Sequence, residues 1–129
     1  MPKYLNPDVL DNGLQHIIDL AAGDVDLLLI DTYTQGQAYA TVNSNKVMTI
    51  NLAPGDLVLG AYGSGRKLTV AEKSGTASGN ATPSDLHVAI VDVTNSAVLA
   101  VTDETGEAAV STGDPKTIPS FEIRLTQPV

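Results

Sequence analysis

The stretch Gly60–Lys67 comes closer than any other part of the chain to a nucleotide-binding motif. A phosphate-binding loop has the pattern G-x-x-x-x-G-K-[ST], because the lysine and the hydroxyl must reach the phosphates and the magnesium ion. Arg66 stands where that lysine is required, and Lys67 stands where the hydroxyl is required. The dinucleotide-binding pattern also fails, since Leu68 takes the place of its last glycine. We therefore interpret the stretch as a glycine-bearing turn followed by a strand.

The histidines and serines do not form a recognisable catalytic or zinc-binding pattern. A zinc site needs three or four ligands, and His16 and His87 fall in different predicted elements of a chain without cysteine. Ser64 lies between two glycines but lacks the wider G-x-S-x-G frame of a strained nucleophile turn. The sequence thus predicts a protein that is not an enzyme, although an enzyme with an unfamiliar site stays an alternative.

Two groups of carboxylates are the remaining candidates for ion binding. Asp24 lies close to Asp26 in the sequence, and Asp103 and Glu104 are followed by Glu107. A calcium loop of the EF-hand type needs alternating oxygen ligands, a central glycine and a terminal glutamate, and neither group has them. We interpret both groups as solvated turns and expect no metal and no cofactor.

Composition narrows the classes of partner. The 129 residues fit one domain, and the absence of cysteine excludes disulfides and thiolate metal sites. Only 4% of the residues are aromatic, so the core must be aliphatic and few rings are left for stacking on bases. The net charge of -8 is repelled by phosphate backbones and by anionic membranes. We expect no nucleic-acid partner and no membrane partner.

Residues 6–23 are predicted to form one helix. Apolar residues recur at helical spacing and make one stripe: Leu10, Leu14, Ile17 and Ala21. Gly13 falls inside this predicted helix, where glycine costs about 1 kcal/mol relative to alanine. Gly23 is well placed to end the helix.

Beyond Gly23 the pattern changes to short strands and turns. Val25–Ile30 is an almost continuous apolar run, which predicts a strand buried on both faces or a strand at an interface. Residues 32–45 are polar and are predicted to form a loop with one helical turn near 38–41. Residues 74–84 are also predicted to form a loop, and residues 103–115 are acidic and contain glycine. Further strands are predicted at 47–52, 57–62, 66–73, 86–92, 97–102 and 121–125.

These elements predict a mainly-β fold: an antiparallel β-sandwich or small barrel, jelly-roll or immunoglobulin-like, with one N-terminal helix. The strands at 86–92 and 97–102, joined by a turn at 94–96, are the strongest hairpin candidate. We expect one domain over residues 1–129, with an arm and helix at 1–23 and the sandwich at 24–129.

Several segments, in the same order over nearly the whole chain, resemble a family of small virion proteins of tailed bacteriophages that are often encoded near the major capsid protein. The segments are Lys3–Leu5, Val9–Asp11, Ser64–Ala71, His87–Asp92, Leu99–Thr102, Thr117–Pro119 and Phe121–Arg124. Residues 24–60 depart from the family pattern, which leaves the specific contacts undetermined.

The resemblance implies a capsid decoration, or cement, protein on the outer surface of the head. Such a protein stabilises the shell by bridging subunits of the major capsid protein, and the resemblance favours a homo-oligomer, in particular a trimer. Its place would be the virion, after synthesis in the host cytoplasm, since residues 1–4 lack the features of a secretion signal. The contact residues are expected in the N-terminal segment: Tyr4, Leu5, Val9, Leu10, Leu14 and Ile17.

Two other readings of the sequence stay open. The chain would serve equally as another virion component, in the tail, the connector or a head fibre. A host- or glycan-binding module is the other alternative, and its aromatic platform would have to come from Tyr33, Tyr39 and Tyr62.

Overall fold

Antiparallel strands dominate the structure, a computed structural model that describes residues 4–5, 12–63, 65–82, 85–104 and 109–125. Strands make up 50% of the described residues, and their arrangement is that of a small β-sandwich. Within the described ranges the sheets do not close into a barrel. The predicted mainly-β fold is confirmed, in its sandwich form.

The main sheet has the strand order β1-β8-β7-β2-β3, and all neighbours are antiparallel. Its strands are β1 (Tyr4–Leu5), β2 (Val25–Ile30), β3 (Lys46–Leu52), β7 (His87–Asp92) and β8 (Ala97–Asp103). Every residue of β2 and β7 is buried except Asp26, which is half-buried. An apolar run without alternation is the pattern of a strand covered on both faces. Val25–Ile30 is therefore an interior strand, and the alternative of an interface strand is wrong.

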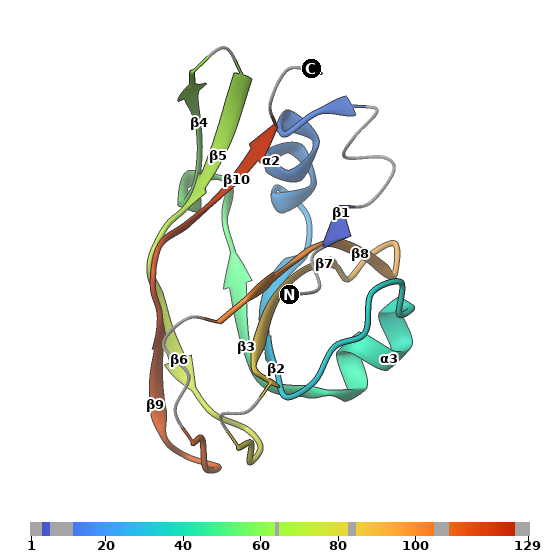
Figure 1. Cartoon of the computed structure of the whole chain (residues 1–129), viewed down its shortest axis with the longest axis vertical. Helices are drawn as coiled ribbons and strands as arrows, with labels where there is room; N and C mark the ends of the chain where they lie inside the picture. Colours follow the sequence, from blue (N-terminus) through green and yellow to red (C-terminus); the bar gives the residue numbers. More distant parts are fainter. Residues whose placement is uncertain (1–3, 6–11, 64, 83–84, 105–108, 126–129) are drawn as a thin grey trace.

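The second layer is a long bent ribbon of paired strands (Figure 1). Its strands are β4 (Leu57–Tyr62), β5 (Gly65–Val70), β6 (Lys73–Thr76), β9 (Pro115–Ile118) and β10 (Phe121–Leu125), in the sheet orders β10-β5-β4 and β6-β9. The register continues without a shift from Val70 opposite Phe121 to Lys73 opposite Ile118. Pro119, which has no N–H to donate, lies where the ribbon bends. The two smaller sheets are thus one continuous pairing interrupted at a bend.

Different elements cover the two faces of the main sheet (Figure 1). The helices are α2 (Gln15–Ala21), α3 (Tyr39–Ser44) and the short 3-10 helix η1 (Pro54–Asp56). Leu27 and Leu29 of β2 point into the larger core, which the ribbon and α2 close. Leu28 and Ile30 point the other way, into a smaller core that includes Val42 of α3. The fold therefore has three layers, with the main sheet in the middle.

The predicted N-terminal helix is wrong in its extent. Helix α2 begins at Gln15 and ends at Ala21, and residues 6–11 lie outside the described part of the chain. Gly13 has a φ of +73°, a left-handed conformation that glycine adopts without steric cost. It therefore belongs to a turn that leads into α2. The stripe residues Leu14, Ile17 and Ala21 are buried, as the helical spacing predicted.

Strand β6 extends into a predicted loop, and strand β9 was not predicted. The strand predicted at 66–73 is interrupted, and β6 continues into the segment 74–84, while β9 begins inside the acidic segment that ends at residue 115. These short strands consist mostly of Lys, Ser, Gly and Thr, so no apolar alternation marks them. Backbone pairing within the ribbon holds them in place. The helical turn expected near 38–41 is α3, and the predicted hairpin is β7–β8.

Gly75 sets how closely the ribbon approaches the edge of the main sheet. A Cβ at this position would lie 2.9 Å from Cγ1 of Ile50 and 3.3 Å from Sδ of Met48, both on β3. Contacts that short force neighbouring groups to move. The absence of a side chain at Gly75 is thus what lets the backbone of β6 lie against β3.

We expect Gly75→Ala to lower the free energy of unfolding by about 1–3 kcal/mol, because the added methyl group overpacks the contact with Ile50 and Met48. Gly55→Ala is the matched control, since a Cβ at Gly55 meets no atom within 4 Å. The control should change stability by less than about 1 kcal/mol. Urea denaturation measures both variants, and equal stabilities would contradict the close contact between β6 and β3.

Candidate functional site

His87 is fully buried at the start of β7. Its Nδ1–H donates to the carbonyl oxygen of Asp85 at 2.9 Å, and its Nε2 lies 3.7 Å from Oδ1 of Asp103, beyond hydrogen-bond distance. The ring of Tyr33 packs on it at a tilt, with 5.8 Å between ring centroids. An imidazole without exposed surface has no access to a substrate, so His87 acts as a core residue. His16 is half-buried on α2.

The two groups of carboxylates have different partners in the fold. The side-chain amide of Asn51 donates to Oδ1 of Asp24 at 3.4 Å and to Oδ1 of Asp26 at 3.2 Å. Partial burial raises the pKa of Asp26, against the lowering effect of the Asn51 hydrogen bond. Asp103 faces His87, whereas buried Glu104 lies 4.0 Å from Nζ of Lys116. Glu107 lies outside the described residues.

In the residues that the structure describes, no group of three or more His, Asp or Glu side chains could hold a metal ion. None of the described helices is long and apolar enough to cross a bilayer.

Asp56 fastens the bend of the ribbon to the end of β3. Its Oδ2 accepts the backbone N–H of Ala53 at 2.9 Å and pairs with Nζ of Lys73 at 3.1 Å. Its carbonyl oxygen accepts the N–H of Ala71 at 2.9 Å. The hydrogen bond from Ala53, together with Lys73, lowers the pKa of Asp56. This carboxylate is therefore structural: it joins η1 to the first residues of β6.

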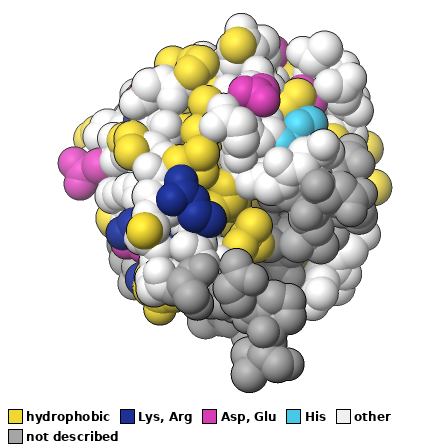
Figure 2. Space-filling model, turned by 90° about the horizontal axis from the view of Figure 1, so that it is seen from above, with side chains coloured by type: hydrophobic (Ala, Val, Ile, Leu, Met, Phe, Trp, Pro, Cys, Tyr) yellow, Lys and Arg dark blue, Asp and Glu magenta, His cyan; other side chains and the backbone are white. Residues whose placement is uncertain are grey.

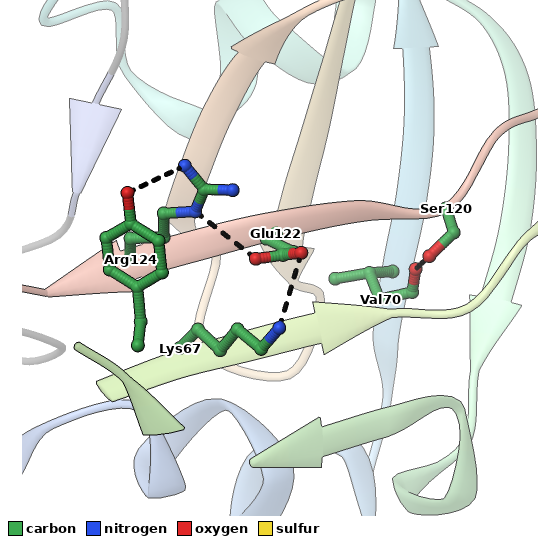
Figure 3. A network of polar contacts seen from close by, with 6 residues as sticks. Lys67, Val70, Ser120, Glu122 and Arg124 are labelled. Atoms are coloured by element: carbon green, nitrogen blue, oxygen red, sulfur yellow. Dashed lines mark hydrogen bonds and ion pairs between the residues drawn. The ribbon is translucent and has the colours of Figure 1, made fainter. Parts of the chain in front are cut away.

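The outer face of the three-stranded sheet carries a network of charged and aromatic side chains (Figure 3). Glu122 of β10 accepts from Nε of Arg124 at 3.2 Å and pairs with Nζ of Lys67 at 3.5 Å. The guanidinium of Arg124 lies 4.2 Å from the ring centroid of Tyr62 and donates to its hydroxyl at 3.2 Å. Arg124 and then Lys67 lower the pKa of Glu122. The network spans β4, β5 and β10.

This outer face also exposes apolar surface. Val58 is 60% exposed and Tyr62 is 38% exposed, and they are the exposed large hydrophobic residues among those described. Val58 stands opposite Thr69, and Glu122 stands opposite Thr69 from the other side, so all three share one row of the sheet. Exposed apolar side chains beside ordered charges on a rigid sheet are typical of a protein-binding surface.

A groove of about 310 Å³ opens between the start of α2 and the inner side of the same sheet. Leu14, Leu59 and Leu125 form its apolar walls, and Asn12, Gln15 and Arg66 form its polar rim. Figure 2 shows this end of the molecule, where hydrophobic side chains gather in a stripe beside a basic side chain. Among the described residues that line it, Arg66 is the charged one.

The six predicted contact residues do not form one exposed docking stripe among the described residues. Leu14 and Ile17 are buried in the core of this chain, so the prediction that they contact another subunit is wrong while α2 stays docked. Tyr4 and Leu5 form β1, which pairs with Val101 and Ala100 of β8. Val9 and Leu10 lie outside the described residues.

The outer face was missed by sequence reasoning, although a signal for part of it existed. The alternation of Glu122 and Arg124 with apolar residues predicted one exposed side of β10. Lys67 alternates in the same way on β5, but the sequence does not show that β5 and β10 are neighbours. Only the pairing of strands more than 50 residues apart brings Lys67 to Glu122.

We expect Asp56→Asn to lower the free energy of unfolding by about 1 kcal/mol at neutral pH, because it removes the ion pair with Lys73. A carboxyl with a lowered pKa in the folded state stabilises the fold above its unfolded pKa, near 3.8, and loses that effect as pH falls through the folded pKa. The difference between wild type and variant should thus shrink in acid. Denaturation from about pH 7 to pH 2 measures it.

Asp31→Asn is the control for that series. Its exposed side chain has no hydrogen bond or ion pair to the described residues, so the same loss of charge should change the free energy of unfolding by less than about 0.5 kcal/mol. An Asp56→Asn difference that stayed constant to pH 2 would contradict the assigned role.

Comparison with known proteins adds no relative. No family model, curated protein or solved structure matches the chain.

Proposed function

We propose that the chain is a structural protein of a bacteriophage particle: a decoration protein that binds the outer surface of the head and bridges subunits of the major capsid protein. The resemblance of its segments to small virion proteins supports the phage assignment. The observation that carries the binding role is the outer face, where Val58 and Tyr62 are exposed beside the Lys67–Glu122–Arg124 network. Binding through such a face needs no chemistry, only a surface that keeps its shape.

The polar groups that would serve an enzyme are already used within the fold. His87 is enclosed, Asp24 and Asp26 share the amide of Asn51, and Asp56 is paired with Lys73. An active site instead leaves titratable groups converging on an open cavity. These contacts favour a binding protein over an enzyme.

The distribution of charge favours this face as the one that docks. The whole chain carries 15 acidic and seven basic residues, whereas the network on the outer face has two cations, Lys67 and Arg124, around one carboxylate, Glu122. Docking through this face leaves most of the acidic surface in solvent, where like-charged particles repel one another. An interface of standard size, about 800 Å² on each partner, would extend beyond these side chains to the rest of the sheet.

The glycan-binding alternative would need Tyr33, Tyr39 and Tyr62 on one surface. Tyr33 is buried against His87, and Tyr39 lies on α3, on the far side of the main sheet from Tyr62 on β4. The three tyrosines therefore form no common platform for a glycan. A role in the tail, the connector or a head fibre would use the same face, and the position of the chain in the particle distinguishes these roles. The trimer stays a prediction of the resemblance.

We expect Val58→Lys to weaken binding to capsid shells about tenfold or more, because it places a solvated charge at the centre of the docking face. The shells are assembled from the major capsid protein of the proposed phage, and co-sedimentation measures the dissociation constant. The substitution should leave the stability of the free chain within about 0.5 kcal/mol, since the side chain is already exposed.

Thr41→Lys makes the same change of charge on α3, behind the main sheet, and should bind as wild type does. The wild-type chain should also raise the temperature at which the shells fall apart. Failure of the wild-type chain to sediment with shells would refute the decoration role. Equal losses for both variants would move the docking surface away from the outer face.

A further inference from the structure

Strand β10 is an open edge of the ribbon. It stands last in the order β10-β5-β4, and within the described residues the backbone of 121–125 makes hydrogen bonds to β5 alone. Its register contains no bulge, and no proline falls between Phe121 and Leu125. A regular edge without such protection is a template on which another strand can pair.

The side chains along β10 form a self-complementary series. Along the strand, Phe121, Ile123 and Leu125 alternate with one acid, Glu122, and one base, Arg124. The series has the same order of chemical types in either direction, except that the two charges exchange places. A strand of this kind matches its own copy when the two run antiparallel.

We propose that β10 pairs with β10 of a second copy of this chain, antiparallel, about a twofold axis through Ile123. Each Ile123 then stands opposite its equivalent, and each Phe121 stands opposite Leu125 of the other copy. Each Glu122 stands opposite Arg124 of the other copy, which makes two cross-strand ion pairs per dimer. Twofold symmetry is the commonest arrangement of protein oligomers, and it requires such a self-matching surface.

The charges select this register over its neighbours. A slip of one residue would send the side chains of one strand to opposite faces. A slip of two would remove both Glu122–Arg124 pairs and place either Arg124 or Glu122 opposite its own copy. Opposite charges on facing residues stabilise an antiparallel pair, while like charges destabilise it. The ion pair already present between Glu122 and Arg124 holds both side chains on the outer face, ready for partners across the axis.

The apolar row gives the pairing its hydrophobic contribution. Phe121, Ile123 and Leu125 pack on the larger core but remain only partly buried, because no strand lies beyond β10 in the described sheet. A second β10 would extend this row and cover its open side. The joined sheet would have the order β4-β5-β10-β10-β5-β4, with both outer faces on the same side.

The other described edges lack these features. Strand β4 carries no charged residue and includes Gly60, so nothing in it selects a register. The edge of β3 is covered by β6, where Gly75 lies against Ile50. Strand β1 has two residues, too few to hold a partner strand. Edge pairing through β10 is independent of the decoration role, although a dimer would offer two docking faces to a shell.

Charge reversal tests the pairing. In Glu122→Arg both facing positions become arginine, and in Arg124→Glu both become glutamate, so each variant alone meets like charges across the axis. We expect the wild-type chain to reach the mass of two 13.4 kDa copies in sedimentation equilibrium, at concentrations from about 1 µM to 1 mM. Each single variant should dimerise at least about tenfold more weakly.

Mixing the two single variants provides the sharpest readout. Their mixed dimer places arginine opposite glutamate at both positions, so dimerisation should return in the mixture, and it should also return in the double variant that exchanges the two charges. Circular dichroism checks that every variant is folded, and salt of about 0.15 M screens the long-range repulsion between acidic copies.

Each outcome decides the proposal. Recovery in the mixture, with hydrogen exchange of residues 121–125 slowed in the dimer, supports the pairing. A wild-type chain that stays monomeric, or that forms a trimer, overturns it. Single variants that dimerise as well as wild type, or a mixture that does not recover, place any dimer contact elsewhere and overturn it as well.

Discussion

Both faces of β2 and β7 must be covered, and the rest of the architecture follows from that requirement. These neighbouring strands carry apolar side chains on each side, and an uncovered face would leave a row of Val, Leu and Ile in water. The ribbon and α2 cover one face, while α3 and the ring of Tyr33 cover the other. A thin aliphatic core of this kind can stabilise a cysteine-free chain only if both layers stay in contact with the main sheet.

The continuous register of the ribbon explains how one short chain covers so much of the sheet. Strands β5 and β6 run past β10 and β9 as one pairing, bent where Asp56 joins η1 to the start of β6. The bend lets the upper half of the ribbon pack over α2 and the lower half lie against β3. The close approach to β3 is possible because Gly75 has no Cβ. Charged side chains that the core cannot accept are left on the outer face of the ribbon, and there they form the surface on which binding is proposed.

Sequence patterns predicted the elements that are buried and regular, and missed those held by backbone pairing. Val25–Ile30 and Phe121–Leu125 were recognisable because apolar continuity and period-two alternation follow directly from burial on two faces or on one. Strands β6 and β9 lack that pattern, since their stability comes from partners distant in the sequence. The helix predicted at 6–23 was too long because the apolar spacing continues across Gly13. The positive φ of Gly13, which separates it from α2, is visible only in three dimensions.

The sequence by itself determined the mainly-β fold, an aliphatic core without disulfides, an acidic surface and the absence of familiar catalytic motifs, because these depend on residue types and short-range spacing. Tertiary structure alone decided that the stripe of Leu14 and Ile17 is used inside the chain, and that Lys67, Glu122 and Arg124 share one face. It also decided that β10 is an edge. The physical reason is that strand order and register depend on contacts between residues far apart in the chain, which local patterns do not encode.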